Sequence, residues 1–468
     1  MSRKKQKTAE VEFKGIAHKG TSVGRTDEGL VVFVQGALPG ERAEVLFTKK
    51  RKGVWQGNLI RTIRPSEYKV TAVCNHFGIC GGCSWQNLDY REQLKQKELL
   101  VRDALVRIAK IPDAIIETIL PATNTEFYRN KLEFTFSKHK WLTEEEMGLE
   151  LVEEEKLALG FHRPGNFNKV VNISRCFLQS ERSNDIRNFV KEFAIKNKVD
   201  FYDIKKQQGF LRNLIIRSNT QNEYLCILSI AYSNDEFTKA LKEELVHAFK
   251  EISSIYIVIN PKKNDTLFDL DFQKIYGDDY ITEYLDHAKF LIGPKSFFQT
   301  NSQQAAKLYQ LIAAYADLKG DEIIYDWYCG VGSIGIYLAK NAAKVIGVEE
   351  IQEAIEDARL NAALNQLKNC HFYISDAKAV QIESIIQDHG LPNLIIVDPP
   401  RIGLHELVIE QLKYLKAPKL IYVSCNPATQ ARDLDLLKES YEVIKIKPVD
   451  MFPHTNHIES VALLSLLT

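Results

Sequence analysis

Short apolar runs separated by Gly and Pro turns dominate the first part of the chain. Between residues 8 and 64, β-type runs occur at 30–34, 43–47 and 57–60, and Leu38-Pro39-Gly40 provides a turn between the first two. Each run is too short for an ordinary helix. Several short strands at this spacing predict a small β-barrel.

The rest of the chain alternates strand-like and helix-like patterns. Residues 90–110 have a helical pattern, and strand-like runs and amphipathic helices follow. The runs lie at 132–136, 157–161, 211–216, 224–230 and 255–259, and the helices at 181–198 and 236–251. This pattern predicts an α/β middle domain. Beyond residue 300 the regular alternation predicts a doubly wound parallel sheet. The expected domains are residues 1–66, 67–295 and 296–468.

Composition and charge narrow the class of protein. The chain has 468 residues, 45% hydrophobic and 26% charged, and no apolar run approaches the ~18 residues of a membrane span. No apolar stretch follows the basic N-terminus, so no secretory signal is predicted and the expected location is cytoplasmic. Residues 1–64 hold 14 Lys and Arg against 6 Asp and Glu, although the whole chain has zero net charge. A basic barrel on a neutral body can attract phosphates.

A glycine-rich turn follows a predicted buried strand that ends at Asp326. The next predicted strand ends at Glu349, where a carboxylate can bind the two hydroxyls of a ribose. The spacing Gly330-x-Gly332-x-x-Gly335 matches the dinucleotide fingerprint, so a nicotinamide or flavin enzyme is a competing interpretation. The motifs further along favour S-adenosylmethionine, which carries the same ribose without a pyrophosphate.

A thiol and two carboxylates stand at the ends of predicted strands near the C-terminus. Cys425 and Asp398 each follow an apolar run, and Glu459 interrupts an otherwise apolar strand. A thiolate that adds to carbon 6 of uracil lets carbon 5 attack a sulfonium methyl, and a base must then remove the carbon-5 proton. Cys425 and Glu459 suit these two roles. Pro427 is well placed to begin a helix, whose N-terminus is expected to lower the pKa of the thiol.

Four of the eight cysteines have the composition of a metal site. Cys74, Cys80 and Cys83 lie close together around two glycines, and Cys176 is a distant candidate for the fourth position. The glycines would let the chain fold around a cluster and offer N–H groups to sulfur. Zinc and an iron–sulfur cluster are both compatible with this spacing. A radical S-adenosylmethionine enzyme is disfavoured, because the first gap is longer than in those enzymes and a fourth cysteine is available.

Together these motifs resemble those of the RNA uracil-5-methyltransferase family. The matching pieces are Phe298-Gln299-Thr300-Asn301, Asp326-Trp327-Tyr328-Cys329-Gly330-Val331-Gly332, Asp398-Pro399-Pro400-Arg401, Ser424-Cys425-Asn426-Pro427 and His457-Ile458-Glu459. Residues 8–64 resemble the TRAM module, an OB-like barrel common on RNA-modifying enzymes. The resemblance spans essentially the whole chain and implies a Rossmann-like S-adenosylmethionine methyltransferase domain at its C-terminal end.

The resemblance also implies roles for individual residues. Cys425 would be the nucleophile and Glu459 the proton acceptor. The residues implied to contact S-adenosylmethionine are Gln299, Tyr328, Glu349, Asp376 and Asp398. The residues implied to hold a four-iron four-sulfur (4Fe–4S) cluster are Cys74, Cys80, Cys83 and Cys176.

The implied partner is RNA, and relatives with both a TRAM module and a cluster favour large-subunit (23S) ribosomal RNA. Shorter relatives that lack both act on transfer RNA, and the motifs do not separate the two substrates. An RNA-binding or ribosome-assembly factor is the alternative from a different class, although the intact pair of Cys425 and Glu459 argues against it. We expect a monomer with no obligate protein partner and no membrane association.

Overall fold

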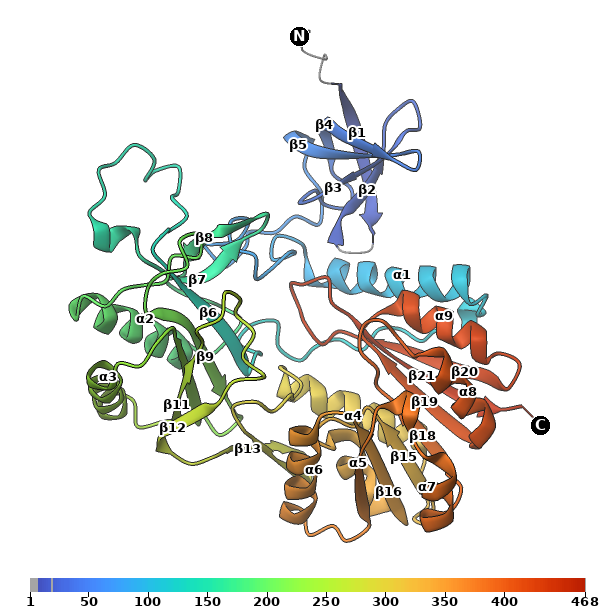
Figure 1. The fold of residues 1–468 in the computed structure, drawn as a ribbon. Helices are drawn as coiled ribbons and strands as arrows, with labels where there is room; N and C mark the ends of the chain where they lie inside the picture. The colour runs from blue at the N-terminus through green and yellow to red at the C-terminus, as the bar shows by residue number, and fades with distance from the viewer. Residues whose placement is uncertain (1–6, 18–19, 468) are drawn as a thin grey trace.

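The computed structural model describes residues 7–17 and 20–467, which form a closed barrel and two larger sheets. Figure 1 shows the barrel above helix α1 (Tyr90–Ile108), with the middle sheet to one side and the C-terminal sheet below α1. The predicted α/β class and the N-terminal barrel are both confirmed. In the described part of the chain, no helix has the length and apolar character needed to cross a membrane.

The barrel closes through strands paired in the order β1-β2-β3-β5-β4. They are β1 (Thr8–Ile16), β2 (Ser22–Arg25), β3 (Val31–Val34), β4 (Arg42–Arg51) and β5 (Val54–Arg64). Alternate apolar side chains, including Val11, Phe13, Val32 and Val45, point inward and form its core. This alternation explains why short runs were sufficient to predict the barrel.

Helix α1 joins the barrel to the C-terminal sheet. Asp89 caps its N-terminus by accepting the Arg91 N–H at 2.9 Å. Val101 packs in a core of the C-terminal sheet, and the Gln96 amide oxygen accepts the Ile16 N–H of the barrel at 2.9 Å. By packing, α1 lies with the C-terminal sheet, although its position in the sequence falls in the predicted middle domain.

The middle sheet has seven strands in the order β12-β11-β10-β9-β6-β7-β8. They are β6 (Lys131–Ser137), β7 (Ala158–Arg163), β8 (Asn166–Asn172), β9 (Leu211–Ser218), β10 (Tyr224–Ile230), β11 (Ile252–Ile259) and β12 (Phe272–Gly277). Helices α2 (Glu181–Lys196) and α3 (Asp235–Ala248) share one apolar core with it. The five runs predicted here are all strands, and the unpredicted β8 and β12 are the two edges, which are less apolar.

The C-terminal sheet has seven strands in the order β17-β16-β15-β18-β19-β21-β20. They are β15 (Ile323–Trp327), β16 (Lys344–Glu349), β17 (Cys370–Ile374), β18 (Leu394–Val397), β19 (Lys419–Ser424), β20 (Tyr441–Val449) and β21 (Glu459–Leu466). Strands β15 to β19 pair in parallel, whereas β21 lies antiparallel between β19 and β20. This edge differs from the predicted parallel sheet, because a loop and not a crossover helix joins β20 to β21.

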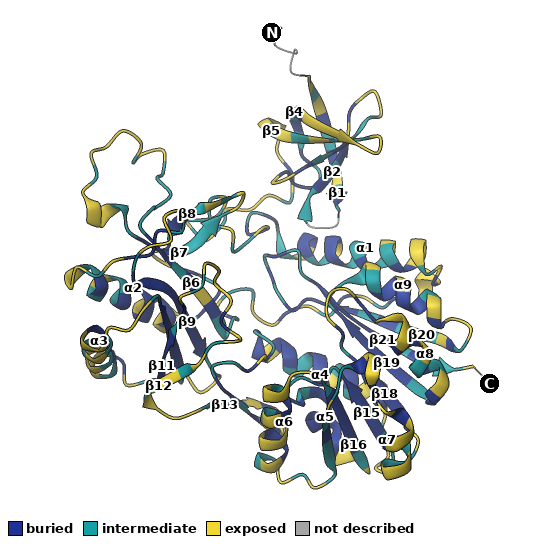
Figure 2. Ribbon diagram, viewed as in Figure 1, coloured by how far each residue is buried: buried dark blue, intermediate teal, exposed yellow. Residues whose placement is uncertain are grey.

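In the chain, a hairpin of β13 (Ile281–Leu285) and β14 (Ala288–Ile292) precedes this sheet. Helices cover both faces of the sheet. The helices are α4 (Ser302–Ala316), α5 (Ser333–Leu338), α6 (Gln352–Leu364), α7 (Ile382–His389), α8 (Glu406–Leu415) and α9 (Pro427–Leu437). Ile324 and Ile396 pack in the core on one face, and Tyr325 and Ile395 in the core on the other. Figure 2 shows the strands as the buried layer between these helices. The carboxyl ends of the parallel strands meet at one edge, where such sheets bind ligands.

Candidate active site

The turn after β15 depends on two glycines. Gly332 has a φ of +76°, and a Cβ there would lie 3.1 Å from the Phe372 ring. A Cβ on Gly335 would lie 2.9 Å from the Asp326 carboxylate, which accepts the Gly335 N–H at 2.9 Å. These glycines let α5 start directly behind the strand. Burial raises the pKa of the Asp326 carboxyl to about 7.

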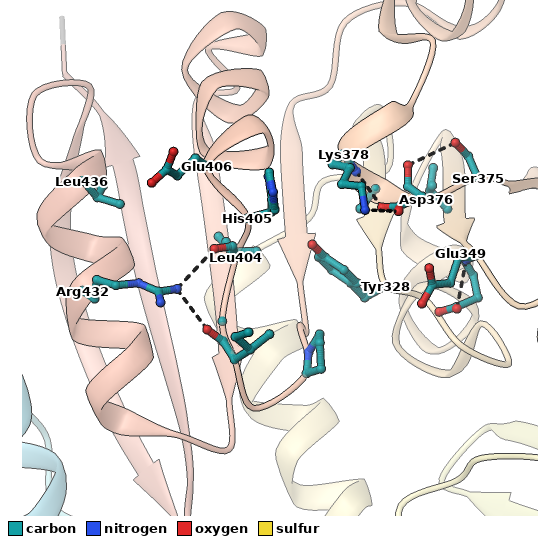
Figure 3. Close-up of a pocket in the computed structure, with 16 residues that line it drawn as sticks. Tyr328, Glu349, Ser375, Asp376, Lys378, Leu404, His405, Glu406, Arg432 and Leu436 are labelled. Carbon is teal, nitrogen blue, oxygen red and sulfur yellow. Dashed lines mark hydrogen bonds and ion pairs between the residues drawn. The ribbon is translucent and has the colours of Figure 1, made fainter.

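A cavity of about 610 Å³ opens beside this turn (Figure 3), and it is referred to from here on as the donor cavity. Three residues predicted to bind the cofactor line it, namely Tyr328, Glu349 and Asp376. The Glu349 carboxylate accepts the Gly330 N–H at 3.2 Å and the Glu350 N–H at 2.9 Å. A carboxylate fixed at this strand end can bind the hydroxyls of a ribose.

Asp376 is already engaged by a neighbouring cation. Lys378 forms an ion pair with it at 2.8 Å, and the Lys378 N–H donates to the same carboxylate at 3.1 Å. The hydrogen bond and charge of Lys378 lower the pKa of the Asp376 carboxyl. Figure 3 shows this pair on the same wall as Glu349, with His405 and Arg432 on the opposite wall. The donor cavity therefore offers both charges to a polar ligand.

A second cavity of about 790 Å³ lies between the barrel, α1 and the C-terminal sheet, and it is referred to from here on as the thiol cavity. The residues that line it include Lys14, Arg25, Phe33, Asp103, Arg107, Arg401, Cys425 and His457. It shares no lining residue with the donor cavity. Pro400 and Ile402 line the donor cavity and Arg401 lines the thiol cavity, so the turn at 398–403 forms a wall between the two.

Strand pairing brings the predicted nucleophile and base together. Ser424 at the end of β19 pairs with Ser460 near the start of antiparallel β21. Extending this register by one residue sets Cys425 opposite Glu459. Asp398 directly follows β18, the parallel neighbour of β19. The three predicted reactive side chains therefore lie at the same edge of the sheet.

The thiol and the carboxyls affect one another's ionisation. Burial, then the charges of Glu459 and Asp398, raise the pKa of the Cys425 thiol to about 11, while Arg401 acts to lower it. Glu459 is 7% exposed, and burial raises the pKa of its carboxyl well above the usual value. Burial raises the pKa of Asp398 to about 7. At neutral pH Cys425 is therefore mostly a thiol.

Arg401 and His457 are functional candidates to which the sequence motifs assigned no role. Arg401 donates to His457 Nδ1 at 2.8 Å. Burial, then the charges of Arg401 and other cations, lower the pKa of His457 to about 4, so the ring is neutral and can accept this bond. Arg401 also favours the ionised forms of Cys425 and Glu459. The Asp-Pro-Pro-Arg motif was the available signal, but spacing cannot show which way a guanidinium points.

Gln299 is placed apart from both cavities. Its carbonyl oxygen accepts from the Asn130 side chain at 2.9 Å, and the Asn130 N–H donates to Thr300 O at 2.9 Å. Its side chain lines neither cavity. Of the predicted cofactor contacts, three share the donor cavity, Asp398 lies with the reactive pair, and Gln299 is separate.

The four predicted metal ligands line one small cavity, and they are Cys74, Cys80, Cys83 and Cys176. The Gly82 N–H donates to Cys80 Sγ at 3.3 Å, and the Gln86 amide donates to Cys83 Sγ at 3.5 Å. Burial raises the pKa of both Cys80 and Cys83 to about 12. Among residues 7–17 and 20–467, no three His, Cys, Asp or Glu side chains are arranged to hold a metal ion. The fold gathers the thiols without arranging them around a single ion.

Comparison with known proteins gives the family. The sequence model described as tRNA (Uracil-5-)-methyltransferase matches residues 271–466, and that of the TRAM domain matches residues 2–60. An uncharacterized RNA methyltransferase of Bacteroides thetaiotaomicron is 42% identical over 454 residues, which cover 96% of this chain and 100% of the relative. One from Porphyromonas gingivalis is 42% identical over 461 residues, covering 97% and 99%.

A solved structure is similar over the whole length. It is the Pyrococcus abyssi tRNA (uracil-54, C5)-methyltransferase in complex with S-adenosyl-L-homocysteine, with a TM-score of 0.75 and 29% identity over 97% of this chain and 100% of that one. The chain belongs to the RNA uracil-5-methyltransferase family. This finding confirms the resemblance and the predicted class of enzyme, an S-adenosylmethionine-dependent RNA (uracil-5-)-methyltransferase with a TRAM domain.

One electrostatic expectation for this methyltransferase is wrong. Helix α9 does begin at Pro427, and Asn426 caps it by accepting the Ala428 N–H at 3.2 Å. Cys425 precedes this cap and lies outside the first turn, where a helix dipole acts most strongly. Burial and two neighbouring carboxyls dominate, so the pKa of the thiol rises instead of falling.

We expect the Cys425 thiol of the methyltransferase to react faster as the pH rises. Because its pKa is raised to about 11, the thiolate fraction and the rate of alkylation by iodoacetamide should increase about tenfold per pH unit between about pH 7 and 10. Arg401→Gln removes a cation that lowers this pKa, so the variant should be alkylated more slowly. Mass spectrometry of the Cys425 peptide measures both rates. A plateau below about pH 8 would show that the site stabilises the thiolate.

Proposed function

We propose that this protein transfers a methyl group from S-adenosylmethionine to carbon 5 of a specific uridine in RNA, through a covalent bond between Cys425 and carbon 6. The observation that supports the proposal is the pairing of Ser424 in β19 with Ser460 in β21. Extended by one residue, this register would set Cys425 opposite Glu459, and Asp398 directly follows the neighbouring strand β18. The wall at 398–403 separates the two cavities. A methyl donor on one side and a uracil on the other would therefore meet at its edge.

The donor cavity would hold S-adenosylmethionine through Tyr328, Glu349 and Asp376, whereas the proposed contacts of Gln299 and Asp398 with the cofactor lie outside the lining of this cavity. Gly330 and Glu350 already fix the Glu349 carboxylate, which would accept hydrogen bonds from the ribose hydroxyls. The bound cofactor supplies an electrophilic methyl group on its sulfonium. The polar rim and the acid at the strand end both fit this ligand.

The reacting residues would act in sequence. Cys425 loses its proton to solvent, its sulfur bonds to carbon 6, and the electron pair of the ring double bond makes carbon 5 nucleophilic. After carbon 5 has taken the methyl group, ionised Glu459 removes the carbon-5 proton, the double bond re-forms and the sulfur is expelled. Arg401 favours the ionised forms of Cys425 and Glu459 that these steps require.

We infer that large-subunit (23S) ribosomal RNA is the substrate, because a TRAM domain and four gathered cysteines occur together here. Lys14, Arg25 and Arg107 in the thiol cavity would contact phosphates. A base in folded RNA would have to leave its stack to reach the thiol. Free thiols at all eight cysteines suit a reducing compartment, so the proposed location is the cytoplasm, and the proposed state is a monomer.

Transfer RNA is the second candidate substrate. The Pyrococcus abyssi enzyme, which by its name acts on tRNA, is matched over its whole length. A ribosome-assembly factor without methyl transfer has less support, because Cys425 and Glu459 are both present and their neighbours Ser424 and Ser460 pair across β19 and β21.

The four gathered cysteines would hold a 4Fe–4S cluster, the group that the resemblance implies, although four thiolates serve zinc as well. A four-iron cluster is larger and is held by four thiolates. Gly82 and Gln86 supply the N–H donors to sulfur that such a cluster requires.

Methyl transfer from a radiolabelled donor tests the proposed reaction. The purified protein is incubated with ribosomal RNA or transfer RNA from cells that lack the gene, and the labelled nucleotide is mapped by mass spectrometry. We expect label at carbon 5 of a single uridine in large-subunit RNA. Label only in transfer RNA would replace the proposed substrate, and label in neither RNA would contradict the proposed activity.

The same preparation tests the cluster. It should be brown and contain iron and acid-labile sulfide in equal amounts, because four thiolates retain the cluster during purification. Cys176→Ser should lose this iron, whereas Cys370→Ser, in β17 and outside the cysteine cavity, should retain it. A colourless protein with stoichiometric zinc would refute the cluster.

A further inference from the structure

The loop between β20 and β21, residues 450–458, leads directly into Glu459 and is referred to below as the base loop. Asp450 and Met451 in it are fully buried. His454 has a φ of +63°, a left-handed conformation that non-glycine residues rarely adopt unless neighbours impose it. The contacts of this loop therefore decide where the Glu459 carboxylate stands.

One set of contacts comes from the segment that follows Cys83. The N–H groups of Ser84 and Trp85 both donate to His454 O, at 2.8 and 3.0 Å. No residue separates Cys83 from this pair of bonds. A shift of residues 74–85, referred to below as the cysteine segment, would therefore move the carbonyl of His454.

Gln93 of α1 forms hydrogen bonds with residues on both sides of this contact. It is fully buried, and its amide oxygen accepts the His454 N–H at 2.9 Å. Its amide nitrogen lies 3.0 Å from Trp85 O, 2.8 Å from Leu88 O and 3.1 Å from His454 Nδ1. One turn further along α1, Lys97 donates to Phe452 O at 3.0 Å. Gln93 thus bonds at once to the cysteine segment and to the base loop.

A second set of contacts starts from Cys176. The next two residues, Phe177 and Leu178, accept backbone bonds at 2.7 Å from Phe127 and Arg129. Between those donors, the Tyr128 hydroxyl donates to Pro453 O of the base loop at 2.9 Å. Cys83 and Cys176 are therefore both connected to the base loop. Cys83 is connected through the adjacent Ser84 and Trp85, and Cys176 through residues 127–129.

We propose that the cysteine segment positions the catalytic carboxylate, with Gln93 as the positioning residue that transmits its placement to the base loop. This inference rests on the proposed function and assigns the four cysteines to one step of it, the removal of the carbon-5 proton. Cys425 lies between β19 and α9, which make none of these contacts. Thiol addition and methyl transfer would therefore proceed while release of the product from Cys425 slows.

The test compares two buried glutamines of the same helix. Gln93→Leu keeps the side-chain volume and removes the bonds to His454, and we expect kcat to fall about 100-fold, as for a small misplacement of a catalytic group. RNA affinity should stay within about threefold, and a covalent protein–RNA adduct should accumulate on denaturing gels. Gln96→Leu, whose lost partners are Ile16 of the barrel and Glu92, should leave the adduct at the wild-type level.

Hydrogen exchange supplies a readout that does not depend on activity. The amide hydrogens of Ser84 and Trp85 should exchange faster in Gln93→Leu than in Gln96→Leu, because their acceptor at His454 moves. Cys83→Ser should show the same faster exchange and the same adduct. Tyr128→Phe, which removes the hydroxyl that donates to Pro453 O, provides a milder variant that should accumulate a smaller amount of adduct.

Three results would decide against the inference. Unchanged exchange at Ser84 and Trp85 in Gln93→Leu would overturn it. Loss of RNA binding without any adduct would assign the cysteine segment to RNA recognition instead. A normal adduct level in both Gln93→Leu and Tyr128→Phe, while Glu459→Gln does accumulate adduct, would reject the positioning role and leave the proposed function intact.

Discussion

Glu459→Gln should convert the protein into one that captures its RNA and fails to release it. The amide has the shape of the carboxyl but cannot take the carbon-5 proton, so multiple turnover should fall by about 10²–10⁴-fold. Cys425 remains able to bond to carbon 6, and the bond cannot break until that proton has left. A shifted band on a denaturing gel, labelled by both RNA and methyl donor, measures the trapped species.

Glu439→Gln is the matched control, because this carboxylate is exposed and belongs to neither cavity. It should turn over like the wild type and show no band. If Glu459→Gln released methylated RNA at the normal rate, another group would be the base, and Asp398 would be the next residue to replace.

Cys425→Ser should abolish methyl transfer without disturbing the methyl donor. A hydroxyl is far less acidic and less nucleophilic than a thiol, so we expect a loss on the order of 10⁴-fold or more in turnover. The donor cavity does not include Cys425, so the affinity for S-adenosylhomocysteine should not change. Turnover by radiolabel and affinity by calorimetry give the two numbers.

Cys370→Ser controls for the loss of a thiol elsewhere, since Cys370 lies in β17 and should be silent in both assays. The double variant Cys425→Ser with Glu459→Gln should form no adduct, which places the thiol before the base in the reaction. Adduct in the double variant would mean that a different nucleophile bonds to the RNA.

The sequence could predict what depends on local patterns. The apolar runs at 323–325, 394–397 and 419–423 are strands, and Pro427 does begin a helix. Cys425 and Asp398 were recognisable because a polar residue directly after a buried parallel strand faces the ligand edge of the sheet.

Other features depend on tertiary contacts that no local pattern records. The insertion of β21 between β19 and β20 is a matter of strand order. The register of β21 against β19, extended by one residue, then brings Glu459 opposite Cys425. The raised pKa of Cys425 arises from burial, whereas the sequence showed only the helix that follows it. Packing of α1 beside the C-terminal sheet brings Gln93 to His454, 361 positions away in the chain.

The wall formed by residues 398–403 has a kinetic consequence. Because the two cavities it divides have no residue in common, neither substrate would block the entrance of the other. The two substrates could then bind in either order, and S-adenosylhomocysteine could be exchanged for S-adenosylmethionine while a long RNA stays bound. Initial-rate patterns with both substrates varied would show intersecting lines, with each product competing only against its own precursor.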